Sequence, residues 1–134
     1  MPLIALETIQ AQIASVLASW GMPDEHVKTT AELMVEADAR GIDSHGIGML
    51  PQYHDRRKDG RIIVPGDIRV VKDLAAMTFI DAGHALGHVP AKMAMQSAID
   101  KAKDMGVAIG VVRDSNHFGA AGVYSTMALE QGMI

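Results

Sequence analysis

The chain has 134 residues, of which 49% are hydrophobic and 21% charged, and its formal net charge is −4. This balance is typical of a folded globular protein and excludes a disordered segment. The mild negative charge predicts neither nucleic acid nor an anionic membrane as a partner. The chain has no cysteine, which excludes disulfides, thiolate metal sites and a cysteine nucleophile within it.

The two ends of the sequence bear on the cellular location of the protein and on its length. The N-terminus has no basic stretch ahead of an apolar core, and Glu7 interrupts it early, so no signal peptide is expected. No apolar run approaches the roughly 18–20 residues that span a membrane. We therefore expect a cytoplasmic protein. The sequence stops at Gly132-Met133-Ile134, where a helix end would lead into a new strand, and this predicts a truncated version of a longer protein.

Apolar residues recur at helical spacing in the first third of the chain and predict a helical hairpin. The first helix is expected over residues 6–20, with one apolar stripe along it. The second is expected over residues 24–40, with Asp24 as its cap and Gly41 as its stop. A third, short helix is predicted through Tyr53.

The rest of the chain alternates strands with helices and predicts a mixed α/β fold. Strands are expected over residues 67–73, 75–81 and 107–112. The first two are expected to be joined by a turn at Lys72-Asp73. The third is a continuous apolar run, which is typical of a strand buried on both faces. Helices are expected over residues 90–106 and 119–131.

The loop after the second helix carries the first candidate site, Ser44-His45-Gly46. Histidine is the side chain best suited to exchange protons near neutral pH, and a neighbouring serine can orient a substrate oxygen. Gly46 would let the backbone approach a ligand closely. The alternative is a capping serine followed by a solvent-exposed loop histidine.

The second candidate site lies between the strand predicted over residues 107–112 and the helix after it. It is the run Ser115-Asn116-His117-Phe118, followed by Gly119 and Gly122. Ligands bind at such carboxyl ends of strands in open α/β sheets, and free N–H groups at a helix start favour anions. The alternative is an ordinary loop in which asparagine and glycine serve turn geometry.

Three further features are interpreted as structural. The loop Gly83-x-x-x-Gly87 lacks the G-x-G-x-x-G pattern of a dinucleotide site and is expected to form a tight turn. His84 and His88 are four residues apart, but the surrounding glycines argue against one helix through both, so no metal site is expected. The run Arg56-Arg57-Lys58 is interpreted as a solvated helix face.

Two separate segments, in this order, carry a resemblance to a known family. Residues 37–46, Ala-Asp-Ala-Arg-Gly-Ile-Asp-Ser-His-Gly, and residues 115–124, Ser-Asn-His-Phe-Gly-Ala-Ala-Gly-Val-Tyr, resemble the type 2 malate/L-lactate dehydrogenase family, which is unrelated in fold to the Rossmann dehydrogenases. The layout of residues 81–87 and of the following helix is similar as well. The resemblance covers essentially the whole chain. It implies an N-terminal helical region over residues 1–60 and the start of a cofactor and substrate domain over residues 61–134.

The resemblance implies an oxidoreductase that moves a hydride between NAD or NADP and a small 2-keto acid or 2-hydroxyacid, in a homodimer. It implies that His45 and His117 are catalytic, that Ser44 and His117 contact the substrate, and that Gly119 and Gly122 lie against the cofactor. Hydride delivery to a ketone leaves an alkoxide, and a nearby histidinium can protonate it and stabilise the developing charge. Which histidine carries the proton stays open.

One position departs from many members of the family, which carry an arginine where this chain has Met49. A bidentate arginine is the natural clamp for a carboxylate. The substrate carboxylate is therefore expected elsewhere, at the helix start after His117 or on an arginine such as Arg56. Two alternatives remain open: a cyclic-imine carboxylate reductase of the same family, and a truncated remnant without activity.

Overall fold

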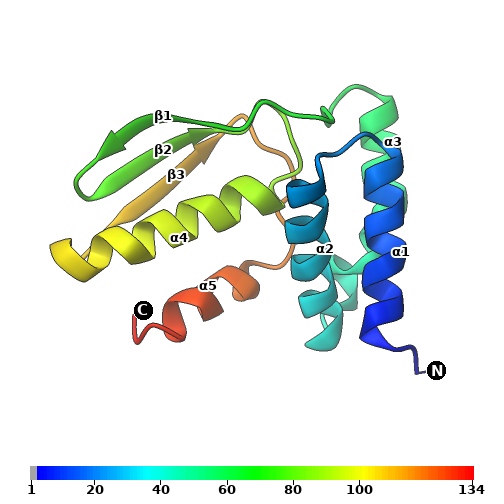
Figure 1. Cartoon of the computed structure of the whole chain (residues 1–134), viewed down its shortest axis with the longest axis horizontal. Helices are drawn as coiled ribbons and strands as arrows, with labels where there is room; N and C mark the ends of the chain where they lie inside the picture. Colours follow the sequence, from blue (N-terminus) through cyan, green and yellow to red (C-terminus); the bar gives the residue numbers. More distant parts are fainter. Residues whose placement is uncertain (1–2) are drawn as a thin grey trace.

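The computed structural model describes residues 3–134. Helices come first and a small sheet with two more helices follows: α1 (Leu6–Ser19), α2 (Asp24–Ala39), α3 (Leu50–Lys58), β1 (Arg69–Leu74), β2 (Met77–Asp81), α4 (His88–Met105), β3 (Ile109–Arg113) and α5 (Ala121–Leu129). Figure 1 shows α1 and α3 at one end, the sheet with α4 against it at the other, and α2 between them. The mixed α/β fold predicted from the sequence is confirmed.

The predicted helical hairpin is formed by α1 and α2, which pack along their apolar stripes. Ile13 and Leu17 of α1 and Met34 of α2 are fully buried. Burial of each such side chain stabilises the fold by about 1.5–3 kcal/mol. The prediction that Asp24 caps α2 is wrong, because Pro23 is the N-cap and Asp24 is already helical. The carboxylate of Asp24 still complements the helix dipole from the first turn.

The sheet has the order β1-β2-β3, with β1 antiparallel and β3 parallel to β2. A parallel pair needs a crossover, and α4 supplies it between β2 and β3. The turn between β1 and β2 lies at Ala75-Ala76 and not at Lys72-Asp73 as predicted. The register of β1 shifts between Val70 and Lys72. Such an irregularity disturbs the alternation of polar and apolar residues, which therefore does not indicate where the strand ends.

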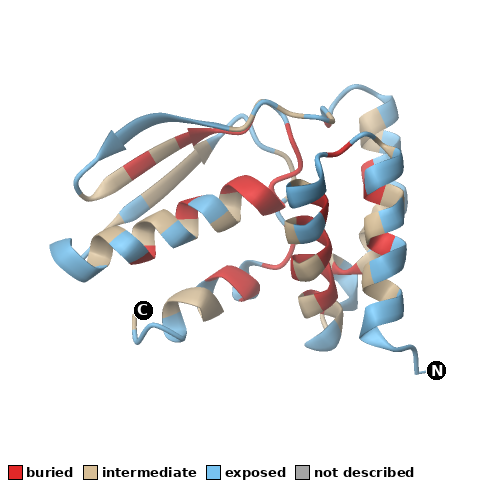
Figure 2. Ribbon diagram, viewed as in Figure 1, coloured by how far each residue is buried: buried red, intermediate tan, exposed pale blue. Residues whose placement is uncertain are grey.

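The last strand differs from its prediction in burial. β3 is an edge strand with half-buried central residues and exposed ends, so the prediction of a strand buried on both faces is wrong for this chain. Its inner side lies against α4, where a Cβ at Gly110 would stand 2.5 Å from the carbonyl oxygen of Ala94. Figure 2 shows that burial is concentrated where α2 meets the start of α4 and of α5, and that β1 is exposed along its length.

Two apolar clusters meet at α2. The larger joins α1, α2 and α3 to the segments before and after the β1–β2 hairpin, through Tyr53, Ile62 and Leu86. The smaller joins Leu33 and Ala37 of α2 to the start of α5. The helix therefore connects the Ser-His-Gly loop at its own C-terminal end with the loop ahead of α5. The division into regions 1–60 and 61–134 stays a prediction.

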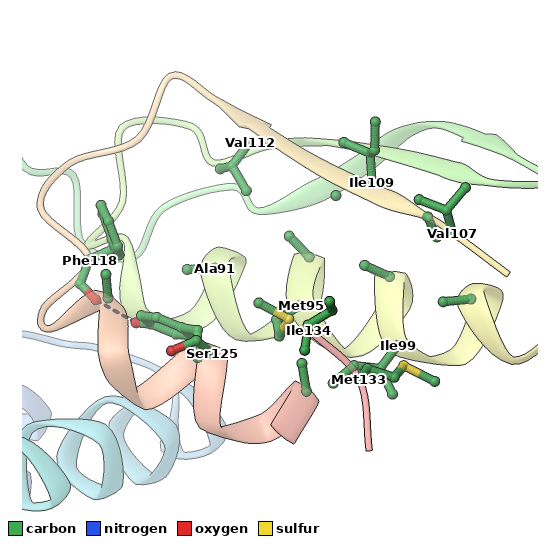
Figure 3. A pocket seen from close by; sticks show the side chains of 18 of the residues that line it. Ala91, Met95, Ile99, Val107, Ile109, Val112, Phe118, Ser125, Met133 and Ile134 are labelled. Carbon is green, nitrogen blue, oxygen red and sulfur yellow. Dashed lines mark hydrogen bonds between the residues drawn. The ribbon is translucent and has the colours of Figure 1, made fainter. Parts of the chain in front are cut away.

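An apolar groove of about 1070 Å³ lies between α4, β3 and α5. Figure 3 shows Ala91, Met95 and Ile99 of α4 on one side of it, with Val107, Ile109 and Val112 opposite. Tyr124 is its one titratable side chain, and that hydroxyl already donates to the carbonyl oxygen of Phe118. This groove therefore lacks groups for acid–base chemistry. Among the described helices, none has the length and apolarity needed to cross a membrane.

Candidate active site

The fold brings the two predicted catalytic histidines together. The ring centroids of His45 and His117 lie 5.3 Å apart, with the rings tilted by 30°. His45 ends a short 3-10 turn (Asp43–His45) that follows α2, and His117 lies in the loop between β3 and α5. Both side chains are half-buried. The two segments that carried the resemblance thus meet at these two rings, and we call their surroundings the histidine site.

The Ser-His-Gly loop is held by the end of α2. The carboxylate of Asp38 accepts a 2.9 Å hydrogen bond from the N–H of Ile47, and a Cβ at Gly46 would lie 1.7 Å from that carboxylate. Gly46 therefore makes room for Asp38, whereas the sequence had suggested room for a ligand. The hydroxyl of Ser44 is 2.8 Å from Nδ1 of His45, and its contact with a substrate stays a prediction.

His117 is held by a tyrosine that sequence reasoning did not single out. The hydroxyl of Tyr53, a fully buried residue of α3, lies 2.7 Å from Nδ1 of His117. The N–H of Gly119 donates to the same nitrogen at 3.4 Å. The neighbouring Asn116 side-chain amide fastens the loop, since it donates to the carbonyl oxygens of Arg61 and His84 at 2.9 and 2.7 Å.

Positive charges surround His117 in the histidine site. Burial lowers the pKa of His117, and the positive charges of His45 and Arg56 lower it further. Arg56 follows Tyr53 by three residues, which places both on one face of α3. The interpretation of residues 56–58 as a solvated face is wrong for the first two, because Arg56 and Arg57 are half-buried. The Arg57 guanidinium lies 5.3 Å from the centre of the Trp20 ring.

A third histidine lies close to the two predicted ones, and the sequence analysis considered it only as a rejected metal pair with His84. His88, the first residue of α4, is 1% exposed, and neither of its ring nitrogens has a hydrogen-bond partner among residues 3–134. Its ring meets that of Tyr53 edge-on, with centroids 6.0 Å apart. A Cβ at Gly119 would lie 2.7 Å from Nε2 of His88, so the backbone of the His117 loop packs directly against this imidazole.

The buried imidazole predicts an acid-sensitive fold. Burial lowers the pKa of His88 from 6.5 to about 3. Between these two values the unfolded chain binds more protons than the folded chain. The free energy of unfolding should therefore fall as the pH decreases below 6.5, by up to about 1.4 kcal/mol per pH unit for this group. Urea unfolding at several pH values measures the slope.

The matched variants are His88→Gln, which removes the buried imidazole, and His54→Gln, which removes an exposed one. We expect a flatter slope in the first and the wild-type slope in the second. A His88→Gln variant with the full wild-type slope would show that another group causes the acid sensitivity.

The two glycines predicted to contact a cofactor differ in their surroundings. Gly119 has a φ of +79° and is packed on His88, whereas Gly122 has open space where a side chain would stand. The helix α5 begins at Ala121, two residues later than expected, so His117 lies four residues ahead of the helix start.

The glycine loop before α4 behaves as the sequence predicts. Gly83 has a φ of +54°, and its missing side chain makes room for the backbone of Asp67. His84 lies in this loop and His88 on α4, so no single helix carries both. Within residues 3–134 no group of three or more histidine, cysteine or acidic side chains is arranged to hold a metal ion.

Comparison with known proteins identifies the family to which a chain with this fold and this pair of histidines belongs. The family described as malate/L-lactate dehydrogenase matches residues 4–134. The chain belongs to the malate/L-lactate dehydrogenase family.

Named relatives agree in sequence and in structure. The malate/(S)-sulfolactate dehydrogenase of Methanothermus fervidus is 43% identical over 132 residues, which are 98% of this chain and 39% of the relative. The structure of sulfolactate dehydrogenase from Methanocaldococcus jannaschii superposes with a TM-score of 0.91 at 43% identity, over 97% of this chain and 38% of that one. A delta1-piperideine-2-carboxylate reductase from Pseudomonas syringae pvar. tomato superposes with a TM-score of 0.88 at 26% identity, over 98% and 40%. The chain thus spans two fifths or less of these proteins.

Proposed function

We propose that this chain supplies the proton-handling part of an active site that interconverts a small 2-keto acid and its 2-hydroxyacid. The observation that carries the proposal is the convergence of His45 and His117, from two distant segments, with Arg56 near enough to act on His117. Groups for proton exchange and for binding a carboxylate are both needed in this reaction. The names of the relatives favour malate or sulfolactate, whose second acidic group suits a site with positive side chains.

The cofactor proposed is NAD or NADP, which, when bound, supplies the hydride for C2 of the keto acid. The residues of the histidine site fit such a reaction because a histidine can donate a proton to the carbonyl oxygen as the hydride arrives. Of the two glycines predicted to contact the cofactor, Gly122 is the one with open space. The homodimer and the cytoplasmic location also stay predictions.

In the reductive direction the residues of this chain have distinct tasks. Arg56 attracts the substrate carboxylate, in the role that Met49 cannot fill. Protonated His45 gives its N–H proton to the carbonyl oxygen and is left neutral, while Ser44 keeps its ring oriented. In the oxidative direction the same imidazole takes up the hydroxyl proton. The carbonyl group takes up one hydride at carbon and one proton at oxygen, which balances its reduction to a hydroxyl group.

A cyclic-imine carboxylate reductase is the second candidate, favoured by the similarity to the piperideine-carboxylate enzyme. It would need the same proton donor and the same carboxylate contact. The non-catalytic remnant is the third hypothesis. It predicts that His45→Ala and His117→Ala change stability without changing the affinity for any ligand.

A chimera tests the proposal. Residues 1–134 would replace the segment that they match in the M. jannaschii sulfolactate dehydrogenase, whose structure superposes closely on this chain. We expect the chimera to oxidise NADH or NADPH in the presence of a 2-keto acid, measured by absorbance, over a panel that includes a cyclic imine carboxylate. A folded chimera that is inactive on every substrate would contradict the proposal and favour the remnant.

A further inference from the structure

One buried side chain is packed against both groups that hold the ring of His117. These groups are the hydroxyl of Tyr53 and the N–H of Gly119, which lie 2.7 and 3.4 Å from Nδ1 of His117. The ring of His88 meets the Tyr53 ring edge-on, with centroids 6.0 Å apart. A Cβ at Gly119 would stand 2.7 Å from Nε2 of the same imidazole. His88 therefore bears on both contacts of His117 at once.

The stability of the fold does not explain an imidazole at this position. His88 is 1% exposed, and neither nitrogen of its ring has a hydrogen-bond partner among residues 3–134. Burial of an unpaired polar group costs free energy, which an apolar side chain of similar size would not cost. Stability alone would therefore favour an aliphatic residue such as leucine at the start of α4.

The shape of the imidazole suits the space between Tyr53 and Gly119. A flat ring is thin, so the backbone of the His117 loop can approach it closely. Gly119 allows this approach because it has no Cβ and has a φ of +79°, a conformation that favours glycine. A branched side chain at position 88 is thicker than a flat ring and would displace the Gly119 backbone or tilt the Tyr53 ring. Either movement would lengthen a contact to Nδ1 of His117.

We propose that His88 is a positioning residue of the histidine site, which keeps Tyr53 and Gly119 in contact with His117 and thereby fixes the orientation of that ring. Burial lowers the pKa of His88 to about 3, so the imidazole is neutral at neutral pH and acts through its shape. The effect of His88 on catalysis rests on the function proposed above, whereas the positioning itself can be measured without substrate.

The titration of His117 reports whether its two contacts are in place. A backbone N–H can only donate, so the contact with Gly119 makes Nδ1 an acceptor, and the Tyr53 hydroxyl donates to it as well. Two donors to one nitrogen favour the neutral ring. The charged groups that face His117, Arg56 from α3 and His45 from the Ser-His-Gly loop, are not altered by a substitution at position 88. Longer contacts should therefore raise the pKa of His117 toward the ordinary 6.5.

His88→Leu tests the proposal by NMR titration of the histidine rings in the 134-residue chain. We expect a higher titration midpoint for His117 in this variant. The planar amide of His88→Gln should keep the midpoint close to that of the wild type. Val89→Ala is the control for general loosening, because it removes buried methyl groups from the neighbouring position of α4. It should lower the stability to urea and leave the midpoint of His117 unchanged.

A wild-type midpoint in a folded His88→Leu variant would overturn the proposal, and so would an equal shift in Val89→Ala. The wild-type chain supplies a check that needs no folded variant. We expect through-space NMR contacts from the His88 ring to both the Tyr53 ring and the Cα hydrogens of Gly119. The absence of either contact would contradict the positioning role.

The chimera separates this proposal from the proposed function. His88→Leu should lower its kcat by up to about 100-fold with little change in KM, and His88→Gln should restore most of the loss. An inactive chimera, together with the expected shift of His117 in the short chain, would reject the dehydrogenase reaction alone. An active chimera whose kcat and pH profile do not respond to His88→Leu would reject the positioning role alone.

Discussion

Gly119→Ala should destabilise the chain by about 3 kcal/mol, although the substitution adds a single methyl group. A φ of +79° costs an alanine about 1 kcal/mol relative to glycine. The new Cβ would also stand 2.7 Å from Nε2 of His88, and such overpacking costs typically 1–3 kcal/mol. His88 is enclosed and cannot swing away, since its ring is 1% exposed and meets the ring of Tyr53 edge-on.

The matched control is Gly122→Ala, three residues further on. Gly122 lies in the first turn of α5, and nothing stands within 4 Å of an added Cβ. Alanine is the better helix former, so this variant should be neutral or up to about 1 kcal/mol more stable. Urea unfolding of the three proteins measures the difference. Equal stability of Gly119→Ala and the wild type would mean that the His117 loop does not rest on His88.

His45→Gln should lower kcat of the chimera by roughly 10²–10⁴, about 3–5 kcal/mol of transition-state stabilisation. Glutamine preserves approximate size and polarity at this half-buried position but cannot exchange a proton. The alkoxide formed by hydride delivery would then have to take its proton from water. The loss should appear in kcat more than in KM, because the proton moves in the transition state.

His117→Gln is the comparison that separates the two histidines. Its side-chain amide still offers an N–H donor, so we expect a smaller loss in kcat than for His45→Gln. The pH dependence of kcat should keep its wild-type shape. An equal loss in both variants, with a changed pH profile for His117→Gln, would assign proton exchange to both residues. Steady-state rates at several pH values, with circular dichroism to establish folding, are the measurements.

Much of this architecture could be predicted from local patterns in the sequence. Apolar residues at helical spacing defined α1, α2 and α4, because these helices bury one stripe each. The strand β3 was located but its burial was not. A continuous apolar run is typical of a strand covered on both sides, yet β3 has a single neighbour in this chain. Burial depends on what else packs there, which a local pattern does not contain.

The site shows the same division. The histidines at positions 45 and 117 stood out by their motifs, and Ser44 by its neighbour. Tyr53 and His88 did not, because each acts on a segment far from it in the sequence. Asp38 did not either, because its local pattern showed no partner for the carboxylate in the loop that follows. Tyr53 is fully buried on a short helix, where its local pattern indicated only packing. The signals available were the position of Asp38 within the first resembling segment and the scarcity of tyrosine, which occurs twice in the chain.

Contacts from Asp38, Tyr53 and His88 fix the positions of the two histidines. Asp38 fixes the backbone of the His45 loop, and Tyr53 fixes the ring of His117. His88 supports both Tyr53 and the backbone of Gly119. Such supporting contacts keep reacting groups near a productive geometry.

The most direct test of the central claim follows a labelled hydride. The chimera would be given a 2-keto acid and NADH or NADPH carrying deuterium at the transferable position, and the product would be analysed by mass spectrometry. We predict a 2-hydroxyacid with one deuterium at C2, formed at least about 100 times more slowly by the His45→Gln variant. A product without deuterium, or equally fast transfer by the variant, would contradict the claim that His45 and His117 form the proton-handling site of a 2-hydroxyacid dehydrogenase.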